Sequence, residues 1–144
     1  MDDVADEMQK RSRFCGFSSK SNVHGEIQFD SFFTEDNNVA GAEMSGGSFT
    51  AGASGIYKVI VNTEITTGTE EQHWVWVMVN GVKMEESMIH TSYSIYATGK
   101  GSDIGSRVLL VQMSAMDTIS LAHEADKDKG YLSASLCVSS VAFQ

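Results

Sequence analysis

The sequence predicts an all-β protein, a sandwich or jelly roll built from roughly eight to ten short strands. Most short segments alternate apolar and polar residues, which is typical of strands with one buried face. The turns between them are made by Gly, Asn, Asp and Ser, because the chain has 13 glycines and no proline. No segment shows a convincing helical pattern.

The segment 106–123 contains the strongest strand signal. Residues 108–113 form a nearly unbroken apolar run in which Gln112 is the only polar interior member, as expected for a strand covered on both faces. Ile119 and Leu121 then alternate with polar or small residues. We therefore expect a β-hairpin whose turn lies at 114–116.

The chain before this segment begins with an arm. Residues 1–12 are charged, with only Val4 and Met8 at helical spacing, so we expect a mobile arm followed by one domain over 13–144. The next features are strands at 14–18 and 26–33, an acidic loop at 34–45 with room for one short strand, a Gly46-Gly47 turn, and a strand at 47–50.

Two longer strands follow, with a polar turn at 68–72 between them. The first begins at Ile56 and places alternate residues on one face, namely Tyr57, Val59 and Val61. The second, 73–79, is apolar on both faces because Trp74, Trp76 and Met78 alternate with valines. Asn80-Gly81 then predicts a type I′ hairpin turn, since both residues tolerate positive φ.

The remaining elements are shorter or charged, except for the last strand. A returning strand is expected at 82–86 and a loosely alternating segment at 88–97, with loops at 98–105 and 123–130. The final strand, 131–143, alternates apolar residues with serines and Cys137. The apolar set is Leu132, Ala134, Leu136 and Val138.

Two strands that are apolar on both faces exceed what a solitary sandwich can bury, because each sheet turns one face to water. Association with sister chains would bury the outer faces of 74–79 and 108–113. The pattern therefore predicts an oligomer.

Composition limits the classes of partner. The chain has 144 residues, 42% hydrophobic and 20% charged, which fits one globular domain. Its net charge of −9 disfavours nucleic acid and anionic lipid, and no apolar stretch is long enough for membrane insertion. No secretory signal follows Met1, which leaves a cytosolic protein and a mature secreted chain as alternatives.

Binding is favoured over catalysis, so we expect no enzyme. The four histidines are scattered, with no pair spaced for one metal. Alternating charges at 126–130 indicate a solvated turn more than a calcium loop. Cys15 and Cys137 form a disulfide if the first and last strands are neighbours, and are otherwise two small buried residues.

An ordered set of short motifs runs through the chain. Together they resemble the C1q globular domain of the C1q/TNF superfamily from Phe14 to Phe143. The motifs are Phe17, Ile27-Gln28-Phe29-Asp30, Asn38, Gly47-Ser48-Phe49-Thr50, Gly55-Ile56-Tyr57, Val79-Asn80-Gly81, Ser106-Arg107-Val108-Leu109-Leu110, Asp117-Thr118-Ile119 and Leu132-Ser133-Ala134. Met116-Asp117 departs from the family's Gly-Asp, and Leu132-Ser133-Ala134-Ser135 departs from its aromatic-Ser-Gly-aromatic.

The resemblance implies a ten-stranded jelly roll with adjacent first and last strands, a compact homotrimer, and a secreted protein. Members of the family bind microbial surfaces, glycans, lipids or protein receptors, and many soluble invertebrate members are lectin-like immune proteins. Their calcium sites lie near the trimer apex, and Asp103 is the nearest match in this sequence.

A glycan site needs exposed aromatic rings that stack on a sugar and polar groups that fix its hydroxyls. The candidates gather near one end of the sandwich and are Ser92, Tyr93, Tyr96, Lys100, His123 and Glu124. Alternatively, Tyr93 and Tyr96 pack at a subunit seam. The chain is then expected to be a lectin-like recognition protein, with a TNF-like ligand for a cell-surface receptor or a structural jelly-roll protein as alternatives.

Overall fold

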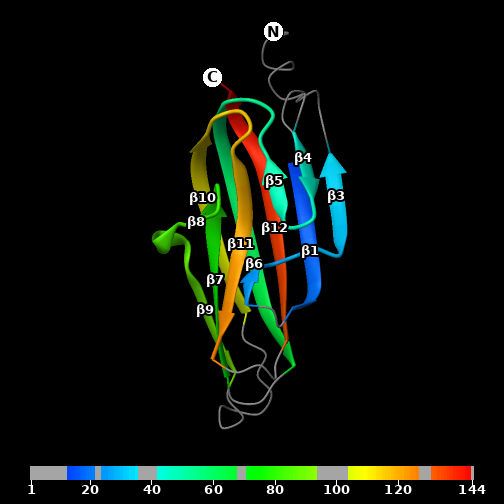
Figure 1. Ribbon diagram of the computed structural model, residues 1–144, viewed down its shortest axis with the longest axis vertical. Coiled ribbons are helices and arrows are strands. Elements are labelled where there is room, and N and C mark those ends of the chain that lie inside the picture. The colour runs from blue at the N-terminus through cyan, green and yellow to red at the C-terminus, as the bar shows by residue number, and fades with distance from the viewer. Residues whose placement is uncertain are drawn as a thin grey trace.

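The computed structural model describes residues 13–21, 24–35, 42–67, 71–93, 104–126 and 131–143. Figure 1 shows that their strands run along the long axis of a two-sheet sandwich. The predicted arm at 1–12 lies outside the described residues. Within the described part, no helix is long and apolar enough to span a bilayer.

The two sheets contain five and seven antiparallel strands. Sheet A has the order β10 (Ile104–Met113), β6 (Gly55–Thr67), β12 (Tyr131–Phe143), β1 (Arg13–Ser21) and β3 (Ser31–Glu35). Sheet B has the order β4 (Glu43–Ser45), β5 (Ser48–Thr50), β11 (Thr118–Ala125), β7 (Glu71–Val79) and β8 (Val82–Lys83); β2 (Gly25–Glu26) also pairs with β11, and β9 (Ile89–Tyr93) with β7. The all-β jelly-roll prediction is confirmed. Ten of these strands are longer than two residues.

The core lies between the sheets and is formed by the predicted inward faces. On β6, Tyr57, Val59 and Val61 are buried, and on β12 the same holds for Leu132, Ala134, Leu136 and Val138. The Tyr57 hydroxyl donates to the Ala53 carbonyl at 2.6 Å, and burial raises the pKa of this phenol. Period-two alternation was therefore sufficient to orient both long strands.

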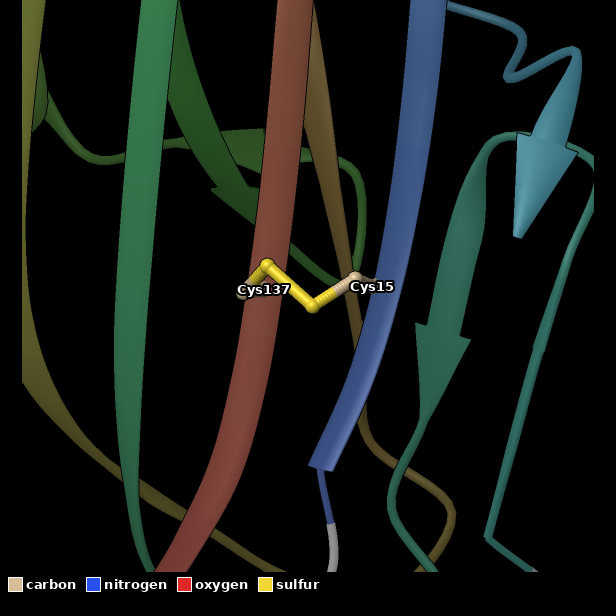
Figure 2. Close-up of a disulfide and its surroundings, with 2 residues drawn as sticks. All are labelled: Cys15 and Cys137. Carbon is tan, nitrogen blue, oxygen red and sulfur yellow. A yellow bond between two sulfur atoms is a disulfide. The ribbon is translucent and has the colours of Figure 1, made fainter. Parts of the chain in front are cut away.

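The first and last described strands are neighbours, as the resemblance implies. Strand β1 pairs with β12 so that Cys15 lies directly opposite Cys137. A disulfide joins the two residues, and Figure 2 shows it crossing between the strands. Of the two possibilities that the sequence left open, the structure contains the covalent one.

The predicted hairpin at 106–123 is wrong. Strand β10 pairs with β6 in sheet A, whereas β11 pairs with β7 and β5 in sheet B. The turn between them therefore crosses from one sheet to the other, and backbone bonds tie it to β5's neighbour Ala51 at both Met116 and Asp117. A short turn can join strands within a sheet or between stacked sheets, so periodicity alone did not decide the pairing.

The predicted strand at 26–33 is also divided between sheets. Glu26 belongs to β2 in sheet B and Ser31 begins β3 in sheet A. Ile27 and Phe29 are buried in the crossing segment, so the alternation was correct although the element was not. Beyond it, Phe32 and Phe33 remain 45% and 46% exposed.

The turn at Asn80-Gly81 is confirmed, with φ values of 51° and 79° that fit a type I′ hairpin. After it, only Val82 and Lys83 continue as strand, and Glu85–Ser87 form one turn of 3-10 helix. The predicted turn at 68–72 and the predicted loops at 98–105 and 123–130 are shorter than expected, because β7 begins at Glu71, β10 begins at Ile104 and β11 continues to Ala125.

Candidate functional site

The described members of the predicted glycan site lie at one end of the sandwich. Ser92 and Tyr93 end β9, and His123 and Glu124 lie near the end of β11. Figure 1 places these strand ends at the bottom of the view, opposite the end of β12. Tyr96, Lys100 and Asp103 lie outside the described residues, so their roles stay predictions.

His123 belongs to a buried polar chain. Its ring is only 1% exposed, and its Nε2 lies 2.8 Å from Nδ1 of His73. The other nitrogen of His73 is 2.8 Å from Oε1 of Glu71, which is itself 2% exposed. The three side chains connect β7 to β11 inside the sandwich, so His123 faces the core and not the surface.

The sequence contained half of this arrangement. His73 shares the inward face of Val75 and Val77, and His123 shares that of Ile119 and Leu121. Continuing this alternation to 73 and 123 would have placed both histidines inward, but His123 is predicted above to lie in a loop and in the glycan site. That the two rings meet depends on the register between β7 and β11, in which His123 lies opposite Val75 and Ala125 opposite His73.

Glu124 points to the other side of β11, onto the outer face of sheet B. Its Oε2 lies 3.0 Å from Nδ1 of His24. This hydrogen bond lowers the pKa of the Glu124 carboxyl. The predicted pair of His123 and Glu124 is therefore divided between the core and the surface.

The outer face of sheet B also presents two tryptophans from β7. Trp74 lies opposite Glu124 and stacks on His90, with ring centroids 5.2 Å apart and planes 8° from parallel. His90 Nε2 in turn lies 2.7 Å from Oε1 of Gln72. These contacts partly cover Trp74 within the chain. Less apolar surface on this outer face is therefore left for burial by a second copy than the sequence predicted.

Trp76 is covered in a similar way. The Lys83 ammonium lies 4.1 Å from the centroid of its indole. A cation held over an aromatic face is attracted by the ring quadrupole. Strand β7 is apolar on both sides, as predicted, but neighbouring strands of the same chain shield its outer side.

The outer face of sheet A is more exposed. Val108 and Leu110 of β10 are 60% and 68% exposed, and Phe33 of β3 is 46% exposed. Residues opposite one another in an antiparallel sheet share a face. The pairings therefore align a row across all five strands: Val108, Ile60, Cys137, Cys15 and Phe33. We call this set the apolar row.

The described residues contain no group of three or more His, Cys, Asp or Glu side chains arranged to hold a metal ion. The predicted metal residue, Asp103, is not among them. The geometry thus offers a polar and aromatic outer face on sheet B, the apolar row on sheet A, and a buried histidine pair between the sheets.

The five- and seven-stranded sheets form a jelly roll whose fold matches solved structures of the C1q and TNF type. Among solved structures, the globular domain of zebrafish complement 1qA is similar at a TM-score of 0.61, with 11% identity over 93% of this chain and 99% of that one. The Eiger TNF of S. frugiperda has a TM-score of 0.55, with 13% identity over 93% of each chain. What is shared at these identities is the fold. No family model and no curated protein matches the chain.

Proposed function

We propose that this chain is a non-catalytic, lectin-like recognition domain that acts as a homotrimer and binds glycans or microbial surface molecules. The similarity to the globular domain of a complement protein supports a recognition role. The predicted strand order and motifs point to the same class.

The observation that carries the assembly is the exposed apolar surface of sheet A. A monomer would leave Val108, Leu110 and Ile104 between 60% and 69% exposed to water. Burying apolar surface is worth about 25 cal/mol per Å² before association costs are subtracted. Contact between copies through this face shields these side chains from water and leaves the outer face of sheet B free for a ligand.

Ligand binding is proposed at the end of the sandwich where β9 and β11 end. Ser92, Tyr93, Tyr96, Lys100 and Glu124 supply the aromatic and polar groups in this proposal, and Asp103 is the candidate for calcium. A glycan array probed with and without calcium tests it. Binding to no glycan in either condition contradicts the lectin function.

A secreted location is part of the proposal. The Cys15–Cys137 disulfide is consistent with an extracellular protein, because disulfides persist in oxidising compartments and are rare in the cytosol. Determining whether the native protein in its source cells is exported with the disulfide formed checks this point.

A TNF-like receptor ligand is the second candidate, favoured by the similarity to the Eiger TNF. Such a ligand binds a cell-surface protein through grooves between subunits. Saturable cell binding that is insensitive to free sugars would support it over the lectin.

A further inference from the structure

The outer face of sheet B holds an indole ring that its own chain supports from one side. Trp74 lies on β7, between β9 and β11 (Figure 1). His90 is directly opposite Trp74 on β9, and the two rings stack nearly parallel. The second face of the indole is therefore turned away from β9, toward the β11 side, where Glu124 lies directly opposite Trp74.

The supporting imidazole is itself held in place. Nε2 of His90 lies 2.7 Å from Oε1 of Gln72, which is two residues before Trp74 on the same face of β7. This contact orders His90, and the stack on His90 in turn restricts the indole. A ring that is already ordered loses little conformational entropy when a ligand packs on it.

The neighbouring tryptophan is not accessible in this way. The Lys83 ammonium lies over Trp76, and Ala122 of β11 is directly opposite on the other side. Ala122 belongs to the outward positions of β11, yet it is only 3% exposed, so larger side chains cover it. The chain itself therefore closes the surface on both sides of Trp76, and Trp74 is the indole with an open side.

An accessible carboxylate lies on that open side. The side chains of Glu124 and His24 are each 44% exposed. Their hydrogen bond, 3.0 Å long, lowers the pKa of Glu124 and keeps the carboxyl anionic at neutral pH. An anionic acceptor beside an indole suits a sugar ring, because the hydroxyls of a sugar donate to the carboxylate while its apolar face packs on the aromatic ring.

The charges around Trp74 favour a neutral ligand. The negative charge of Glu124 is balanced by Lys83, whose charge also lowers the pKa of that carboxyl. The chain as a whole carries a net charge of −9, so acidic sugars, sulfate and phosphate are repelled as they approach.

We infer that the outer face of sheet B binds a neutral sugar ring at Trp74, stacked on the open indole face and hydrogen-bonded to Glu124. This rests on the proposed glycan-binding function, and it gives that function a site on the face that contact through sheet A leaves free. The site adjoins the strand ends where ligand binding is proposed, because Glu124 belongs to both and His90 lies two residues before Ser92.

The tryptophans supply the readout. The chain has two, and both are on β7, so Trp76→Phe leaves Trp74 as the single source of tryptophan emission. The full-length Trp76→Phe protein is titrated with galactose, mannose and N-acetylglucosamine, and with glucuronic acid as the acidic comparison. At least one neutral sugar is expected to change the emission saturably and to bind more tightly than glucuronic acid.

Two substitutions in the otherwise wild-type chain separate the ring from the carboxylate. Trp74→Ala and Glu124→Gln are each expected to weaken binding of that sugar about tenfold in calorimetry, the size of an aromatic contact or of a hydrogen bond to a charged group. Glu43→Gln is the matched control. It removes the same charge from sheet B, but on β4, which β5 and β11 separate from β7, and should leave the affinity within about twofold.

The outcomes distinguish this site from the general function. Glycan binding that leaves the Trp74 emission unchanged and survives Trp74→Ala overturns the assignment and leaves the recognition function standing. Tighter binding of glucuronic acid than of every neutral sugar also overturns it. Emission that shifts with protein concentration in the absence of sugar would place Trp74 in a contact between copies and overturn it as well. No binding of these sugars or of any arrayed glycan overturns both proposals.

Discussion

Met116 holds a backbone conformation that favours glycine. Its φ is 76°, in the left-handed region, and its side chain is 71% exposed. The family that the sequence resembles has glycine at this position. Met116→Gly is therefore expected to be more stable than Met116→Ala by about 1 kcal/mol, since both lose the same exposed side chain but only alanine keeps the strain. Urea unfolding of both variants measures the difference, and equal stability would contradict it.

Asp117 makes the same turn sensitive to acid. Its carboxylate accepts from the backbone N–H of Ser114 at 2.8 Å and from the Asn80 amide at 3.1 Å. These bonds, the first more than the second, lower the pKa of Asp117. A carboxyl with a lowered pKa stabilises the fold above its unfolded value of about 3.9, and that contribution is lost as pH falls through the folded value.

Asp117→Asn should therefore melt below the wild type at neutral pH, and the gap should close in strong acid. Thermal unfolding of both proteins from neutral pH to about pH 2 checks this. A gap that is unchanged across the range would show that the charge of Asp117 contributes nothing.

A substitution at His123 tests how much the buried polar chain of Glu71, His73 and His123 contributes to stability. His123→Ala removes the partner of His73 inside the core and opens a cavity, so we expect a loss of about 2–4 kcal/mol in the free energy of unfolding. His90→Ala is the control, because His90 is exposed and contacts Trp74 and Gln72 on the outer face. If both variants lost the same small amount, the chain from Glu71 to His123 would not be a stabilising feature.

At the scale of elements, the ends of the chain are held together by one covalent bond. The disulfide links β1 to β12 across 122 residues of sequence, in the middle of sheet A. Closing so long a segment restricts the unfolded chain. Replacing both cysteines by alanine is expected to cost about 2–5 kcal/mol.

Denaturant unfolding of the double variant and of the reduced wild type measures that cost. The reduced wild type lacks only the bond, whereas the double variant also lacks two sulfur atoms, one of them on the fully buried Cys15. The reduced wild type should therefore be as stable as the double variant or slightly more stable. A double variant as stable as the oxidised wild type would mean that pairing in sheet A alone holds β1 in place.

At the scale of the whole molecule, the exposed side of sheet A decides the assembly. Leu110→Lys places a charge on β10 where 68% of the leucine is exposed. Light scattering is expected to show a fall in mass from that of a trimer to that of a single chain, because burying an unpaired charge in an apolar contact is costly. Val82→Lys is the control, since Val82 is 69% exposed but lies on β8 of sheet B.

A wild-type protein that stays a single chain at micromolar concentration would contradict the proposed homotrimer. A Val82→Lys variant that also dissociates would place the contact on sheet B. Either result would redirect the search for the ligand, because the face of the sandwich left free would change.

Much of the local structure followed from sequence. Alternation oriented Tyr57, Val59 and Val61 inward, and Asn80-Gly81 identified its turn because only a few residues tolerate positive φ at both positions. The ligand residues were harder to place. His123 and Glu124 were predicted to begin a charged loop. Strand β11 instead continues through both residues, so their side chains point to opposite faces of sheet B.

The sequence by itself determined the inward faces of β6 and β12, the turn at Asn80-Gly81 and the all-β class, because each depends on hydrophobicity and backbone preference within a few residues. Tertiary structure alone decided that β10 and β11 belong to different sheets, that Cys15 bonds Cys137, and that His73 meets His123. These features depend on the register between strands distant in the chain. Register is set by the packing of the whole core, and no local pattern encodes it.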